Sequence, residues 1–148
     1  MTGEAVDRYW ARVTEAGAEV IDLDEAAAGG VAELAPRLDA LVLTGGIEEN
    51  GPFLTTGKHN NVLKATGEPI ARALGKTLVA PIVTLEPGNP MRPNLSPGTI
   101  VLSQATFKAV LTDMANSLKS QGFTNVVMLG DSGGNLNPMK EVAAAVNA

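Results

Sequence analysis

Cysteine is absent from this chain of 148 residues, and histidine occurs once, at His59. Without cysteine the chain can form no disulfide, no thiolate metal site and no cysteine nucleophile. Basic residues are also few, since 11 Lys and Arg face 16 Asp and Glu and give a net charge of -5. The basic residues are scattered and form no positive stripe, so we expect no nucleic-acid partner.

Long apolar runs are missing as well. No stretch approaches the roughly 18 apolar residues that a membrane-spanning helix needs, so we expect no membrane partner. The first residues, MTGEAVDRYW, lack the basic start and apolar core of a secretion signal, which favours a cytoplasmic location. The length predicts a single domain over residues 1–148, with a hydrophobic core large enough to be stable without a disulfide or a structural metal.

Short apolar runs alternate with amphipathic segments along the chain. The apolar runs predict strands at 18–23, 39–44, 77–83 and 124–130. The segments between and after them predict helices at about 6–17, 24–34, 62–74 (interrupted near Gly67 and Pro69), 103–122 and 138–146. Nearly continuous apolar strands are typical of a parallel sheet with helices on both faces. The expected fold class is therefore α/β, a three-layer sandwich around a mainly parallel sheet of about four strands.

Functional residues are expected in three loops, 45–60, 84–98 and 130–136. In open parallel sheets, sites form where loops leave the carboxyl ends of the strands. These three loops are also the richest in Gly, Pro, Asn and charged residues. The order of the predicted strands and the residue types of the loops thus indicate the same edge of the sheet.

The string GDSGG around Ser132 matches the sequence that surrounds the nucleophile of trypsin-like serine proteases. Those proteases carry it in an all-β double barrel, together with a histidine and an aspartate from earlier segments. Here it lies between a predicted parallel strand and a helix, where small residues form a tight turn with amides free to bind an anion. We therefore interpret Ser132 as a turn residue at the functional edge.

Four segments together resemble the creatininase family of metal-dependent amidohydrolases. They are GGIEENGPFLTTGKHNN, SPGTI, the helix that ends at SQGF, and NVVMLGDSGGN, in the family's order and spacing over about residues 45–147. The resemblance implies a creatininase-like, flavodoxin-like fold. It also implies divalent metal ions at the strand ends and hydrolysis of small, often cyclic amides, with a small-molecule amide as the substrate.

Transferred residue by residue, the family's metal-binding glutamate falls on Glu48. The family's two histidine ligands fall on Asn50 and Ser132, and its aspartate falls on His59. The resemblance thus implies an altered site in which Glu48, His59 and Asp131 bind zinc or manganese.

In the implied reaction, Glu48 or Glu49 accepts a proton from metal-bound water, and backbone amides of residues 130–135 stabilise the oxyanion. Other interpretations of the same residues stay open. Glu48 and Glu49 can be solvated carboxylates, His59 an ordinary surface residue, and Asp131 a cap of the turn or of the last helix. Phe53 stands where the family has a histidine, which is a further departure.

The beginning of the chain resembles a different family. Residues 7–46, which end in LVLTGG, are similar to the early part of class I glutamine amidotransferase-like hydrolases, whose cysteine nucleophile is missing here. The alternative function is therefore a recombined or designed α/β scaffold without activity, joined near Gly46. Creatininase chains usually continue beyond the Gly-Gly-Asn turn, so we expect an incomplete site. A sheet of four strands should also leave strand edges uncovered, which predicts a homo-oligomer.

Overall fold

The computed structural model describes residues 39–92 and 95–148. The strand expected at 18–23, the helices expected before residue 35 and nearly all of the segment resembling glutamine amidotransferases lie outside the described residues. The described elements follow in the order β1 (Asp39–Thr44), α4 (Lys58–Leu74), β2 (Thr77–Val79), β3 (Glu86–Gly88), β4 (Val101–Ser103), α5 (Gln104–Ser120), β5 (Val126–Gly130), the 3-10 turn η2 (Gly133–Asn135) and α6 (Leu136–Val146).

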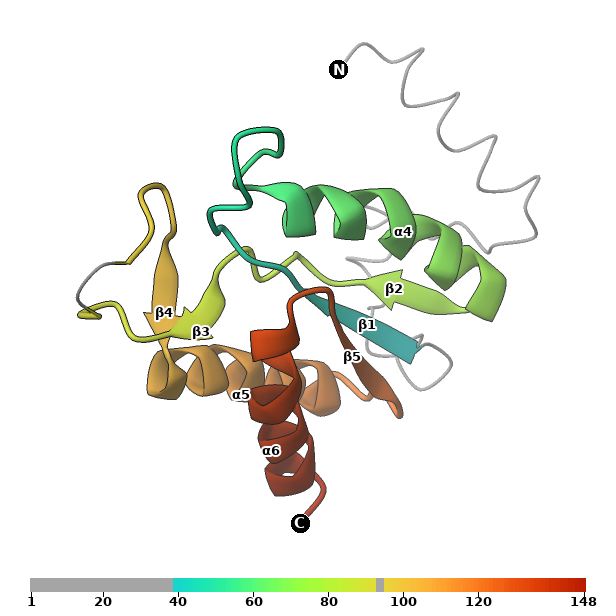
Figure 1. The fold of residues 1–148 in the computed structure, drawn as a ribbon. Coiled ribbons are helices and arrows are strands. Elements are labelled where there is room, and N and C mark those ends of the chain that lie inside the picture. Colours follow the sequence, from blue (N-terminus) through green and yellow to red (C-terminus); the bar gives the residue numbers. More distant parts are fainter. Residues whose placement is uncertain (1–38, 93–94) are drawn as a thin grey trace, which may run out of the picture.

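Strand β1 is the centre of a parallel sheet with the order β2-β1-β5 (Figure 1). It occupies the predicted residues 39–44, because DALVLT is a continuous apolar run that is buried on both sides. The named strand β2 is shorter than the predicted 77–83. Its pairing with β1 nevertheless continues to Val83, whose amide donates to the Leu43 carbonyl at 2.9 Å. The predicted α/β class is confirmed.

Helices cover both faces of the sheet, as Figure 1 shows with α4 on one side and α5 and α6 on the other. Alternate residues of β1 point to opposite faces, so Leu41 and Leu43 pack with Leu63 of α4. Val42 points the other way and joins a larger cluster with Val83, Phe107, Leu111, Met139 and Val142. The site at the carboxyl ends of the strands is thus built on a fully packed centre.

Helix α4 is continuous through Gly67 and Pro69, so the predicted interruption is wrong. Gly67 is required by packing, since a Cβ atom there would lie 2.6 Å from Leu43 Cδ1. The helix therefore approaches β1 closely at this point. It also begins at Lys58, four residues before the predicted start, which transfers His59 from a loop to a helix.

Two short parallel strands, β3 and β4, form a separate pair that the sequence analysis did not predict. Strand β3 has the sequence EPG, which carries no apolar pattern, and it lies inside the segment predicted as a loop over 84–98. Isolated bridges connect this region to the main sheet, Thr44 with Val83 and Ile47 with Ile100. The loops at the carboxyl edge are therefore tied to one another by backbone pairing.

The last two helices agree closely with the pattern. The Ser103 side chain caps α5 by accepting from the Thr106 amide at 3.1 Å, and Gly122 follows the helix with a positive φ of 95°. Helix α6 begins at Leu136, two residues before the predicted Pro138. Among the described residues, no helix combines the length and apolar character needed to cross a membrane.

Candidate functional site

Four titratable side chains meet at the carboxyl edge of the sheet, each from a different segment. Glu48 lies in the loop after β1, His59 in the first turn of α4, and Glu86 at the first residue of β3. Asp131 lies directly after β5. Because β1 and β5 are parallel neighbours, the loops that follow them leave at the same edge.

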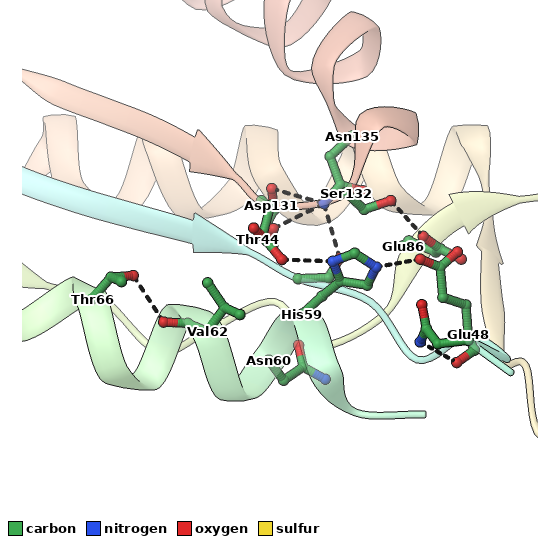
Figure 2. Close-up of polar contacts among 12 residues, drawn as sticks. Thr44, Glu48, His59, Asn60, Val62, Thr66, Glu86, Asp131, Ser132 and Asn135 are labelled. Carbon is green, nitrogen blue, oxygen red and sulfur yellow. Dashed lines mark hydrogen bonds and ion pairs between the residues drawn. The ribbon is translucent and has the colours of Figure 1, made fainter. Parts of the chain in front are cut away.

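His59 lies between two carboxylates, as Figure 2 shows. Its Nδ1 atom is 2.6 Å from Asp131 Oδ2, and its Nε2 atom contacts Glu48 Oε1. The imidazole side chain is 9% exposed, whereas those of Glu48 and Asp131 are 31% and 29% exposed. The predicted proximity of these three residues is confirmed, and His59 is buried at their centre.

Asn60 holds the beginning of α4 in place. Its Nδ2 atom donates to the Thr84 carbonyl at 3.0 Å, which joins the first turn of the helix to the loop that leads to Glu86. Gly45 allows this close approach, since a Cβ atom there would lie 2.0 Å from Asn60 Oδ1. The orientation of His59 therefore depends on side-chain contacts of its neighbour, because Gly57 at the N-cap provides no side-chain cap.

Asn135 joins the end of β1 to the Gly-Gly-Asn turn. The side chain is fully buried, and its Nδ2 atom donates to the Thr44 carbonyl, the Thr44 hydroxyl and the Gly45 carbonyl at 2.9, 3.1 and 2.9 Å. These bonds hold the end of β1 against the turn that contains Asn135. The loop that carries Glu48 and the turn that carries Asp131 thus start from fixed positions.

Glu86 is 7% exposed and accepts a hydrogen bond from the Ser132 hydroxyl, with Ser132 Oγ and Glu86 Oε2 2.7 Å apart. Burial raises the pKa of the Glu86 carboxyl, because desolvation penalises its charged form. The charge of Glu48 and a hydrogen bond with that side chain also raise this pKa, whereas the Ser132 hydroxyl and His59 lower it. Glu86 and Glu48 are therefore close enough for the charge of Glu48 to disfavour ionisation of Glu86.

A polar cavity of about 260 Å³ opens beside this cluster. Its charged lining consists of Glu48, Glu49, Glu86 and Arg92, with polar groups from Asn89, Ser96 and Thr99. His59 and Asp131 are not part of the lining. A ligand in the cavity would therefore meet Glu48, and His59 would act on it only through that carboxylate.

The ligand set Glu48, His59 and Asp131 does not fit a single metal ion in this arrangement. The two ring nitrogens of an imidazole direct their lone pairs away from each other, so carboxylates at opposite nitrogens cannot both join the ring around one ion. Over residues 39–92 and 95–148, no group of three or more His, Cys, Asp or Glu side chains is arranged to hold a metal. The donors are the right chemical types, but the geometry is that of a hydrogen-bonded row.

Several expectations about individual residues can be compared with these contacts. Asp131 contacts His59, and neither η2 nor α6 has a side-chain cap. Ser132 lies in the turn as expected, but it is buried and bonded to Glu86. Glu49 is exposed on the cavity wall, where its backbone amide donates to Thr99 Oγ1 at 2.9 Å.

Glu86 is the site residue that the sequence analysis missed. It belongs to LEPGN, a segment that follows the third predicted strand in one of the three loops assigned to the functional edge. Its position in that loop was the available signal. Nothing in the motif itself distinguishes a buried glutamate from a solvated one.

Comparisons with known proteins place these contacts in a family context. The family profile described as "Creatininase: Creatinine amidohydrolase" matches residues 26–148. This match begins well before Gly46, so it lends no support to a junction of two families there. None of the curated proteins is significantly similar in sequence to this chain.

Solved structures share the fold. One titled "Creatininase Mn" has a TM-score of 0.68 at 21% identity, over 78% of this chain and 46% of its own. A creatinine amidohydrolase has a TM-score of 0.66 at 21% identity, over 84% and 48%. A mutant creatininase described as "Zn-Zn type" has a TM-score of 0.69 at 19% identity, over 84% and 48%.

The present chain thus spans about half the length of each of these structures. At identities this low, the structural similarity shows a common fold and nothing further. The family profile adds sequence evidence, because it matches most of the chain. The protein therefore belongs to the creatinine amidohydrolase family.

Proposed function

We propose that this chain hydrolyses small amides at the cavity bordered by Glu48, with a site altered from that of its relatives. The observation that carries the proposal is the row formed by Glu48, His59 and Asp131, which ends at the cavity wall. A carboxylate that meets the ligand and contacts a buried imidazole is suited to proton transfer. The family's activity on creatinine, as its description states, supports the reaction class.

The row defines a route for the proton. Glu48 accepts a proton from the water that attacks the amide carbon, and a carbon–oxygen bond forms as the proton passes toward His59 Nε2. Asp131 at Nδ1 orients the ring and stabilises the imidazolium that results. When the carbon–nitrogen bond breaks, the proton returns through Glu48 to the departing amine.

The Gly-Gly-Asn turn supplies a candidate for oxyanion stabilisation. Gly133 and Gly134 begin the 3-10 turn beside Ser132, at the amino end of a helical segment. Amides in the first turn of a helix lack intrahelical partners and favour negative charge. Residues 130–135 do not line the cavity, so the oxyanion role expected for this turn stays a prediction.

Zinc or manganese receives no step in this proposal. Two structural relatives are described as Mn and Zn-Zn forms, but the geometry of Glu48, His59 and Asp131 does not suit one ion. The substitutions Asn50 and Ser132, at positions where the resemblance places histidine ligands, agree with that geometry. The proton-transfer row is the chemistry that these side chains support best.

Hydrolysis of creatinine and a panel of small cyclic amides, followed by NMR, tests the proposal. Turnover should be detectable in the wild-type protein and lost in Glu48→Gln, which keeps the side-chain shape but removes the base. Glu141→Gln serves as the control, because Glu141 is exposed and pairs with Lys108 on the surface. Absence of turnover for the whole panel would favour the alternative function, an inactive scaffold.

A further inference from the structure

Glu86 is fixed at the cavity wall more tightly than the other carboxylates that line it. It is 7% exposed, whereas Glu49 is exposed and the Glu48 side chain is 31% exposed. The Ser132 hydroxyl donates to Glu86 Oε2 at 2.7 Å. Gly46 confines the same oxygen from another side, since a Cβ atom at Gly46 would lie 2.9 Å from it.

Two segments thus determine the rotamer of Glu86. Gly46 follows β1, and Ser132 follows β5, so the carboxylate is positioned by both neighbouring strands of the main sheet. A side chain held this way presents a fixed acceptor, which discriminates between ligands better than a mobile one. Glu86 is therefore pre-organised toward the cavity.

An ionised carboxylate accepts hydrogen bonds and cannot donate them. One of its approximately four lone-pair positions is used by Ser132, which leaves others for a ligand. The Glu48 carboxyl lines the same cavity and, when ionised, is a second acceptor. A ligand N–H group satisfies this pair, whereas a ligand carbonyl oxygen would be left unpaired next to two carboxylates.

We propose that Glu86 is the specificity-determining residue of this cavity and Ser132 its positioning residue, selecting amides that carry an amino or imino N–H group next to the reacting ring. The proposal rests on the proposed function for the class of ligand. Arg92 lines the same cavity and has only donors, so it is suited to the carbonyl oxygen of such a ligand. The cavity then matches molecules that have an N–H group on one part and a carbonyl on another.

Binding of two nearly isosteric rings tests this assignment. Creatinine has an amino or imino group where N-methylhydantoin has a carbonyl oxygen, so the pair differs in donor character at one position. Calorimetry should show that the wild-type protein binds creatinine roughly tenfold or more tightly than the hydantoin, since a site built around a hydrogen bond rejects the analogue that lacks the donor. Equal binding of the two rings would overturn the proposal.

Variants of Glu86 and Ser132 test whether these residues cause the preference for creatinine over N-methylhydantoin. Glu86→Gln introduces an amide that both accepts and donates, so the ratio of the two affinities should fall toward one. Ser132→Ala should reduce the ratio, and Ser132→Thr should restore it because the hydroxyl is retained. A ratio that is unchanged in Glu86→Gln contradicts the assignment, and Ser132→Ala provides the same test without altering the carboxylate.

Turnover is measured separately on the same proteins. Binding preference without hydrolysis would refute the proposed function and leave the role of Glu86 supported. Hydrolysis with equal affinity for both rings would support the proposed function and refute the role of Glu86. Melting temperatures of all variants accompany the titrations, so that a general loss of folding is recognised.

Discussion

His59 Nδ1 lies 2.6 Å from Asp131 Oδ2, which joins the first turn of α4 to the turn after β5. The contact makes Asp131 the partner that orients the only histidine in the chain. In hydrolytic sites such a carboxylate fixes the tautomer of the ring and stabilises its protonated form. The two residues therefore act as a unit, and removing the charge of one should impair the other.

Asp131→Asn is expected to lower kcat for amide hydrolysis by roughly a hundredfold with a much smaller change in KM. The reason is that Asp131 does not line the cavity, and in the proposed reaction it supports the imidazolium. Steady-state kinetics measure the two parameters. Asp113→Asn on the exposed side of α5 is the matched control, and a variant of Asp131 with wild-type kcat would contradict the proposed proton route.

Glu86→Gln should stabilise the protein at neutral pH and have little effect near pH 4. The raised pKa of Glu86 means that the folded chain holds this proton more tightly than the unfolded chain, whose value is about 4.5. Stability of the wild-type protein is therefore lost as the pH rises from that value through the folded pKa, and the glutamine variant avoids this loss.

Melting temperatures measured between pH 4 and pH 8 check the sign. The melting temperature of Glu86→Gln relative to wild type should rise steadily between pH 4 and pH 8. Glu141→Gln, on the surface, should show no such growth. A difference that shrinks as the pH rises would show that the ionised form of Glu86 is favoured by folding.

Addition of stoichiometric zinc or manganese should leave the melting temperature unchanged to within about a degree, because a ligand stabilises only when it binds the folded state. The physical reason is the divergent placement of Glu48 and Asp131 about His59. Thermal unfolding with and without metal, after treatment with a chelator, makes the measurement. A rise of several degrees that disappears in His59→Gln would restore the metal site expected from the resemblance.

Gly67→Ala should destabilise the protein by about 1–3 kcal/mol, although alanine is the better helix former. The new Cβ atom would lie 2.6 Å from Leu43 Cδ1, and α4 would have to move away from β1. In a Leu43→Val background that methyl group is absent, so the penalty should shrink in a double-mutant cycle. Additive effects measured by urea unfolding would show that the contact is not the cause.

Self-association is expected through β5. This strand lies at the edge of the described three-stranded sheet, and Val127 and Leu129 are 47% and 36% exposed. Exposed apolar edge strands tend to pair, so light scattering at micromolar concentration should give a mass above that of one chain. Val127→Lys should lower this mass, while Leu74→Lys at the end of α4 should not; a monomeric wild-type protein would contradict the expectation.

The sequence pattern predicted the central elements well because their signals are local. Strand β1 is a continuous apolar run, and α5 has a serine cap and a closing glycine, so their positions follow from the residues themselves. Helix α4 has neither a side-chain cap nor an acidic residue in its first turn. No local feature of the sequence therefore indicated that the helix begins at Lys58 and includes His59.

The chemistry of the site was predictable only in part. That Glu48, His59 and Asp131 meet followed from the parallel sheet, since their segments leave one edge. They form a row with the imidazole in the middle because His59 lies in the first turn of α4. The hydrogen bond from Asn60 to the Thr84 carbonyl holds that turn in place. The burial of Glu86 depends on Ser132 and Gly46, which are distant in sequence, and no short motif encodes such contacts.

The contacts that shape the site join residues separated by 46 positions for Ser132 and Glu86, 72 for His59 and Asp131, and 91 for Asn135 and Thr44. Contacts between distant residues form late, because the chain must first lose the entropy of closing large loops. Folding intermediates of this protein should therefore contain helices α4 and α5 before any of the polar network exists. Synthesis has a similar consequence, since Asp131, Ser132 and Asn135 follow the other site residues along the chain and the site cannot begin to form until they have left the ribosome.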